Sequence, residues 1–137
     1  MLTSFSYPLP KKCIKLIGKN DVGPNCWNAV MYALGATNKL EFIDKYKMSV
    51  WMEENTEIID TPPQPGDILR LNEYSGEIGH TALFLGDDKY FHKVGWNSSV
   101  GWEVVSLARV LEHYHYLNPV PVWYQYVADK QKQEVAS

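Results

Sequence analysis

The sequence predicts an α+β fold in which N-terminal helices pack on an antiparallel sheet of about five strands. Before residue 61, apolar residues recur at helical spacing, whereas short apolar segments bounded by turn residues follow residue 66. Between them lies Thr-Pro-Pro-Gln-Pro-Gly, residues 61–66, which cannot lie inside a helix because proline fixes φ and lacks an N–H donor. Helices followed by consecutive strands are typical of the α+β class.

The first predicted helix spans residues 25–34, and both of its ends carry signals. Asn25 is a favourable N-cap, and Gly35 is a favourable residue after the last turn. A second helical region is expected within residues 40–54, with charged side chains on its solvent side. The apolar residues of the first helix share one face, and they are Cys26, Ala29, Val30, Ala33 and Leu34.

The predicted strands all follow the proline-rich segment. They are short, and Gly, Asp or Asn residues separate them. Ser106 is a suitable cap for a short helix before the last strand. The expected strands are residues 67–71, 80–85, 90–94, 102–105 and 120–127, and the expected helix is residues 107–113.

Length and composition indicate a single domain, residues 1–137. The chain is 45% hydrophobic and 21% charged, which is enough apolar material for one core. Its net charge of −3 offers no basic surface for a phosphate backbone, so nucleic acid is not an expected partner. No apolar segment approaches the roughly 18 residues that cross a bilayer, so no membrane partner is expected.

Cys26 is the first candidate for chemistry because it lies in the first turn of a predicted helix. Free N–H groups and the positive end of the helix dipole stabilise a thiolate there, so a lowered pKa is expected. The same N–H groups could bind the oxyanion of a tetrahedral intermediate. Cys26 also lies on the apolar face, and free cysteine is common in cores. Catalysis therefore requires a base nearby.

His80 and His92 can supply that base if they share a face of the sheet. They do so when paired residue numbers add to an even sum, for example with Ala82 opposite His92 and a three-residue loop at 86–88. The two rings are then diagonal neighbours within reach of one hydrogen bond. A base with an orienting partner is what a cysteine nucleophile requires, and its sulfur should lie within about 4 Å of a His80 ring nitrogen. Taken singly, either histidine could be an ordinary strand residue.

The remaining titratable residues point to no further site. His113 lies near a helix C-terminus, where a cation is mildly favoured, and His115 carries no signal. A metal site would have to combine Cys13, Cys26, His80 and His92, which lack any short chelating spacing. No metal and no cofactor are therefore expected. Two cysteines do not form a disulfide scaffold, and a single bridge stays open.

Several segments in this order resemble the NlpC-type cell-wall endopeptidases, which have the papain-like fold. Asn25-Cys26-Trp27 resembles the Asp-Cys-Ser of that family, and residues 65–68 (Pro-Gly-Asp-Ile) resemble its Pro-Gly-Asp-Leu. Residues 79–86 (Gly-His-Thr-Ala-Leu-Phe-Leu-Gly) resemble its histidine strand, and residues 104–107 its closing strand and helix. His92 falls where the third polar residue lies. The resemblance covers residues 25–113, and the CHAP amidases are similar relatives.

The resemblance implies a papain-like cysteine hydrolase with a Cys-His-His triad. Cys26 would be the nucleophile, His80 the base and His92 the residue that orients His80. The implied reaction is cleavage of an amide bond in peptidoglycan stem peptides or muropeptides through an acyl-enzyme. Trp27-Asn28 replaces the usual Ser-Gly, which indicates a remodelled groove beside Cys26. By their size, Trp27, Trp96 and Trp102 are candidate substrate-binding walls.

Two other functions remain open at this point. One is a deamidase or acyl-transfer enzyme with a protein or lipid substrate, and the other is a catalytically inactive papain-like binding domain. The expected partner is a peptidoglycan fragment or peptide, joined by an inhibitor or immunity protein if the chain is an injected effector. Residues 1–8 lack a charged region before a long apolar stretch, so a cytoplasmic location is expected, or export by a dedicated secretion system or a phage.

Overall fold

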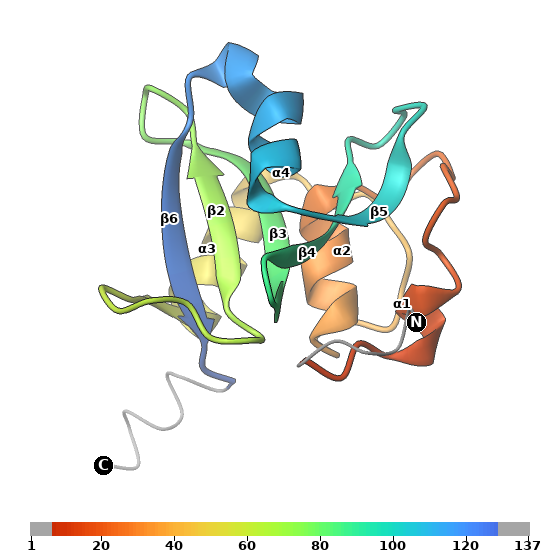
Figure 1. The fold of residues 1–137 in the computed structure, drawn as a ribbon, viewed down its shortest axis with the longest axis horizontal. Helices are drawn as coiled ribbons and strands as arrows, with labels where there is room; N and C mark the ends of the chain where they lie inside the picture. Colours follow the sequence, from red (N-terminus) through yellow and green to blue (C-terminus); the bar gives the residue numbers. More distant parts are fainter. Residues whose placement is uncertain (1–6, 129–137) are drawn as a thin grey trace.

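A computed structural model describes residues 7–128 and shows one six-stranded antiparallel sheet with strand order β1-β6-β2-β3-β4-β5 (Figure 1). The predicted α+β class is confirmed, with six strands in place of about five. The strands are Thr56–Ile58 (β1), Ile68–Asn72 (β2), Ile78–Gly86 (β3), Lys89–Val94 (β4), Gly101–Val105 (β5) and Val120–Tyr126 (β6). The helices are Lys11–Ile14 (α1), Cys26–Ala33 (α2), Lys45–Asn55 (α3) and Leu107–Tyr114 (α4), followed by the 3₁₀ turn His115–Leu117 (η1).

Helices cover both faces of the sheet. Figure 1 shows α2 and α3 behind the sheet and α4 in front of it. Leu83 and Phe91 pack in the core that α2 and α3 share, whereas Ala82 and Tyr90 pack against α4. Since side chains alternate along a strand, the even-numbered positions of β3 and β4 near these residues face α4.

The first predicted helix is confirmed to within one residue at each end. The Asn25 side-chain oxygen caps α2 by accepting the Asn28 N–H at 3.2 Å, as its residue type predicts. The second helix begins later than residue 40, because Asp44 is its cap and accepts the Lys47 N–H at 2.7 Å. Residues 39–43 form no regular element and bond to Asn25 and Asn28 at the start of α2 instead.

The β3–β4 hairpin has the predicted parity with a different turn. Leu83 lies opposite Phe91 and Phe84 opposite Tyr90, so paired numbers add to the expected even sum. The predicted three-residue loop is wrong: Gly86 pairs with Lys89, and a two-residue turn of Asp87 and Asp88 joins them. Both aspartates have positive φ, 51° and 53°, and an irregularity between Phe84 and Gly86 restores the even register.

The two central strands separate beyond Leu83 and Phe91. The first part of β3 pairs only with β2, and the end of β4 pairs only with β5. Backbone groups between the two strands are therefore released from the ladder where His80 and His92 lie. The candidate site forms at this separation.

The N-terminal segment holds the outer edge of β5. The Gly18 N–H donates to the Trp102 carbonyl oxygen at 2.9 Å, and the Trp102 N–H donates to the Lys19 carbonyl oxygen at 2.9 Å. Gly101 has a φ of 72°, and a Cβ there would collide with the Lys19 backbone. The close approach of the two segments therefore requires glycine at this position.

Three further observations bear on the sequence predictions. Cys13 and Cys26 are both free thiols, which settles the open question of a bridge between them. Among residues 7–128, no helix is both long enough and apolar enough to cross a membrane. Residues 1–6, on which most of the location prediction depends, lie outside the described part of the chain.

Candidate active site

Cys26 is the first residue of α2 and lies against β3. Cys26 is only 6% exposed to solvent. The Thr81 hydroxyl donates to the Cys26 carbonyl oxygen at 3.2 Å. This bond ties the start of the helix to the residue that follows His80.

Two asparagines hold the other side of the helix start. The Asn25 amide donates to the Ile43 carbonyl oxygen at 2.8 Å, and its oxygen also accepts the Ile43 N–H at 3.2 Å. Asn28 is fully buried, donates to the Lys39 carbonyl oxygen at 2.9 Å and accepts the Glu41 N–H at 3.2 Å. Asn28 therefore fastens residues 39–43 to the helix, a purpose that a serine or glycine could not serve.

Burial corrects the predicted lowering of the Cys26 pKa. Desolvation raises the pKa of this thiol to about 12, although N–H groups of Thr81, Trp27 and Cys26 and the charge of Lys93 act to lower it. The helix start does favour the thiolate, but the loss of water outweighs it. Without substrate, Cys26 is therefore a neutral thiol, and activation depends on a base.

A chain of hydrogen bonds begins at His80 and crosses three strands. His80 Nε2 lies 2.7 Å from His92 Nδ1, which is the bond predicted from the hairpin parity. His92 Nε2 lies 2.9 Å from Glu103 Oε1. His113 Nε2, from α4, reaches the same oxygen at 2.8 Å. His80 and His92 are both fully buried.

Glu103 fixes the direction of every bond in this chain. Burial acts to raise the pKa of Glu103, but hydrogen bonds and charges from His92 and His113 outweigh it and lower that pKa below its usual value. An ionised carboxylate only accepts, so His92 Nε2 carries a proton and donates it. Burial, the largest cause, lowers the pKa of His92 and holds the pKa of His80 well below the usual value, so both rings are neutral.

The consequence for His80 is a lone pair on Nδ1. Neutral His92 has its proton on Nε2, so its Nδ1 accepts from His80 Nε2–H. His80 then has no proton left for Nδ1. That nitrogen is buried and makes no hydrogen bond within the described chain, so the Cys26 thiol does not donate to it at rest.

Tyr114 of α4 lies beside His80, and it is close enough to Cys26 for the charges of the two groups to interact. Its ring stacks on His80 with centroids 3.9 Å apart and planes inclined by 21°. Burial raises the pKa of Tyr114 above its usual range, and a negative charge on Cys26 raises it further. The stack holds the His80 ring in a fixed plane, and the phenol remains neutral.

The three predicted tryptophans lie in different environments. Trp102 is fully buried and stacks on Phe91 at 5.8 Å, so its indole belongs to the core and has no surface at which to contact a substrate. Trp27 is 9% exposed and also packs in the core. Trp96 is 51% exposed, and with Gly23 and Phe42 it lines an apolar pocket of about 440 Å³.

This pocket adjoins the helix that carries the candidate nucleophile. The Gly23 N–H donates to the Trp96 carbonyl oxygen at 3.0 Å, and Cys26 follows three residues later. A cavity of about 780 Å³ lies elsewhere, between α3 and strands β1, β2 and β6, where Met52, Arg70 and Tyr124 line it. The candidate nucleophile and base do not line that cavity.

Glu103 and His113 were missed as site residues by the sequence reasoning. Glu103 pairs directly with His92 across β4 and β5, so a register for those strands would have placed it beside His92. No sequence signal fixed that register. His113 was interpreted only as a residue near a helix end, and its contact depends on how α4 packs on the sheet.

The model of the NlpC/P60 family matches residues 15–117, which include the helix of Cys26 and the strands of His80, His92 and Glu103. No curated protein and no solved structure matches the chain significantly. The family match confirms the resemblance to NlpC-type proteins, while the relation to CHAP amidases stays a prediction. The chain therefore belongs to the NlpC/P60 family, and this membership supports a hydrolase of the cysteine peptidase type.

Proposed function

We propose that this protein cleaves an amide bond in peptidoglycan stem peptides or muropeptides, with Cys26 as nucleophile, His80 as base and His92 as the orienting residue. One observation carries the proposal. His80 Nδ1 is a buried acceptor without a hydrogen-bond partner among residues 7–128, at the end of a hydrogen-bonded chain anchored on the Glu103 carboxylate. An acceptor nitrogen held in this state is what a general base needs.

The reaction begins with a proton transfer and an attack. As the Cys26 sulfur bonds to the substrate carbonyl carbon, its proton passes to His80 Nδ1. The sulfur and the nitrogen must approach each other for this step, and such bonds commonly tighten only when substrate is bound. The Cys26 N–H is the proposed donor to the oxyanion.

The chain behind His80 stabilises the charge that then forms. Protonated His80 donates through Nε2 to His92, which donates through its own Nε2 to the negative Glu103. His80 next gives the proton to the leaving amine, and an acyl-enzyme remains on Cys26. Water hydrolyses the acyl-enzyme with His80 again as base.

The apolar pocket at Gly23, Phe42 and Trp96 is the proposed substrate contact. Phe42 is 53% exposed and Trp96 is 51% exposed, so both aromatic side chains are accessible to a ligand. Flat aromatic faces suit extended peptides with small side chains, as in stem peptides.

The test is a product analysis with purified sacculi and defined muropeptides. The wild type should release fragments whose masses identify the broken amide bond, and Cys26→Ala should release none. Cys13→Ala is the matched control, since Cys13 is also a buried free thiol but lies on α1. Equal activity of the Cys26→Ala variant would end the triad proposal, and products that carry an added amine would indicate acyl transfer.

A binding domain without catalysis is the second candidate, and one observation favours it. The Cys26 thiol is buried, has a raised pKa and makes no hydrogen bond to His80 at rest. This candidate predicts that the wild type retains muropeptides in an equilibrium binding assay while releasing no product. The product analysis above separates the two functions.

A further inference from the structure

Three metal-type donors meet behind the proposed triad. His92 Nε2, Glu103 Oε1 and His113 Nε2 all lie within 4.8 Å of one another. They come from β4, β5 and α4, so the fold brings together side chains that are distant in the sequence. The proposed hydrolysis uses His92 and Glu103 through their hydrogen bonds, and it assigns His113 no role beyond its contact to Glu103.

We propose that His92, Glu103 and His113 bind a divalent transition-metal ion of the zinc class, and that the bound ion switches off the base His80. The binding of the ion stands on the geometry of these three side chains alone. The switch rests on the proposed function, because it acts on the role that His80 has there.

The donor set fits such an ion. Two imidazole nitrogens and one carboxylate oxygen with an open fourth position are a recurring set for Zn²⁺, with ligand bonds of about 2.0–2.2 Å. Tetrahedral bonds of that length place the ligand atoms roughly 3.3 Å apart. The present nitrogen–oxygen separations of 2.9 and 2.8 Å need to open by about half an ångström. Rotation of the Glu103 and His113 side chains supplies a movement of this size.

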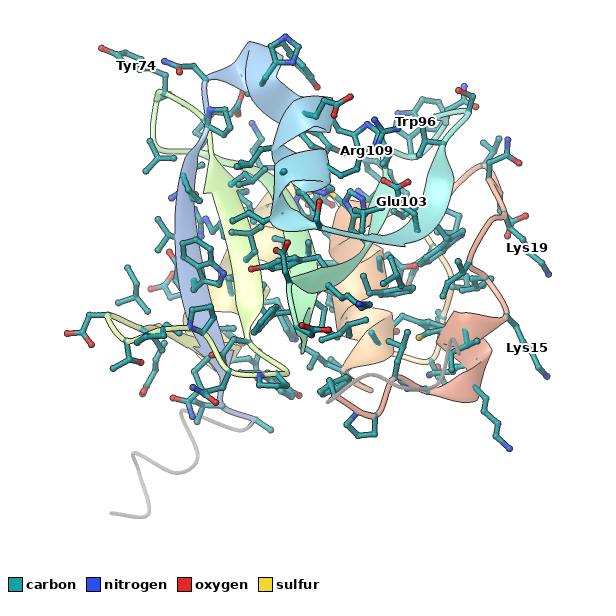
Figure 2. All side chains as sticks on the ribbon, viewed as in Figure 1. Lys15, Lys19, Tyr74, Trp96, Glu103 and Arg109 are labelled. Atoms are coloured by element: carbon teal, nitrogen blue, oxygen red, sulfur yellow. The ribbon has the colours of Figure 1, made fainter. Side chains whose placement is uncertain are left out.

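The cluster has a closed side and an open side. The His92 side chain is fully buried, whereas those of His113 and Glu103 are 12% and 19% exposed. Figure 2 shows Glu103 reaching from β5 toward α4, at the surface between the two elements. An ion can therefore enter past Glu103 and His113 and keep a water molecule as its fourth ligand.

Metal binding reverses the hydrogen bond between the two triad histidines. A metal on His92 Nε2 takes the lone pair there, so the proton of that neutral ring moves to Nδ1. His92 Nδ1 then donates to His80 Nε2, and the proton of His80 moves to its own Nδ1. The lone pair that receives the Cys26 proton is lost. No oxidation and no net proton release from these two rings accompany the change.

Binding is tested by calorimetric titration of Zn²⁺ into the Cys26→Ser protein, in which the Cys26 sulfur beside the proposed triad cannot compete as a ligand. One ion per protein should bind, and His113→Gln in the same background should weaken the affinity by about tenfold or more. His115→Gln is the matched control, since His115 lies two residues further along the chain and, among residues 7–128, hydrogen-bonds only to the Glu112 carbonyl oxygen. Binding that is absent, or equally strong in the His113→Gln variant, would overturn the site.

The tautomer change has its own readout. Nitrogen-15 NMR of the histidine rings in the Cys26→Ser protein should show the His80 proton on Nε2 without metal and on Nδ1 with Zn²⁺. An unchanged His80 spectrum in the metal-bound protein would overturn the switch while leaving the site intact. Both measurements stay informative if the protein proves to have no hydrolase activity.

Inhibition of the wild type completes the test. Zn²⁺ should reduce muropeptide cleavage at least tenfold, a chelator should restore it, and the His113→Gln variant should need about tenfold more Zn²⁺ for the same effect. Zinc bound directly to the Cys26 sulfur would inhibit both proteins at the same concentration, and that result would contradict the proposed switch.

Discussion

Replacing Glu103 with glutamine tests whether one carboxylate sets the tautomers of His80 and His92, the two histidines of the proposed triad. Glutamine keeps the length of the side chain, and its amide oxygen can accept from His92 and His113 as Glu103 does at 2.9 and 2.8 Å. The variant removes the negative charge and adds an NH₂ group that can donate. If this group faces His92 Nε2, the bond to His80 reverses and the base is lost.

The size of the effect follows from the bond that is weakened. A hydrogen bond to a charged group contributes about 1.5–3 kcal/mol, so its loss from the protonated His80 intermediate should lower kcat/KM by about 10- to 150-fold. The loss should appear mainly in kcat, since Glu103 contacts His92 and His113 and does not line the proposed substrate pocket.

The assay is steady-state cleavage of a defined muropeptide between pH 5.5 and 9, with urea unfolding measured on the same samples. Glu112→Gln is the control, because Glu112 is exposed and pairs only with Arg109 at 2.8 Å among the described residues. That change should alter kcat by less than about twofold, as surface ion pairs contribute about 0–1 kcal/mol. Equal rates for Glu103→Gln and wild type, with wild-type stability, would refute the tautomer argument.

Three further predictions concern the apolar pocket at Trp96, the buried His80 and the edge strand β5. Trp96→Ala should raise KM about tenfold, because covering half an indole with substrate is worth about 1–2 kcal/mol. Tyr74→Ala, which removes an exposed aromatic side chain on another loop, is the control. An equal rise of KM in that variant would contradict a substrate contact at Trp96. The unfolding free energy should fall by about 1.4 kcal/mol between pH 7.5 and 5.5 from His80 alone. The lowered pKa of His80 means that only the unfolded chain takes up a proton on this residue in that pH range. Urea titrations that show constant or rising stability toward pH 5.5 would exclude a buried neutral His80. Gly101→Ala should cost about 3 kcal/mol, because a side chain there has a strained φ and meets the Lys19 backbone, and an unchanged melting temperature would show that this approach is not tight.

The parts of the fold that the sequence predicted well are those set by local signals. The cap at Asn25 and the apolar face behind it define α2 within one residue at each end. Strand alternation predicted that His80 and His92 share a face only in an even register, and the structure has that register although the turn itself is different. Strand β1 was missed because its three residues have no pattern of their own and depend on pairing with β6.

The parts of the site that the sequence did not predict depend on distant packing. The helix start at Cys26 gives a local reason for a low pKa, but the elements that bury the sulfur come from elsewhere in the chain and reverse the sign. The size of Trp102 suggested a groove wall, whereas its position opposite Lys93 on β4 places it in the core. Glu103 and His113 meet only because β5 and α4 converge beside His92.

The close backbone approach of Gly101 and Lys19 affects the proposed proton transfer at His80, although the two residues do not contact His80. Sliding β5 by a single residue along β4 would turn Glu103 to the opposite side of the sheet and leave His92 without its anion. The backbone of residues 18–19 contacts no reacting atom. Its two hydrogen bonds to Trp102 nevertheless hold β5 in the register that keeps Glu103 beside His92, and the proposed proton transfer to His80 depends on that contact. Substitutions at residues 18–19 should therefore lower kcat to the extent that they weaken the pairing of β5.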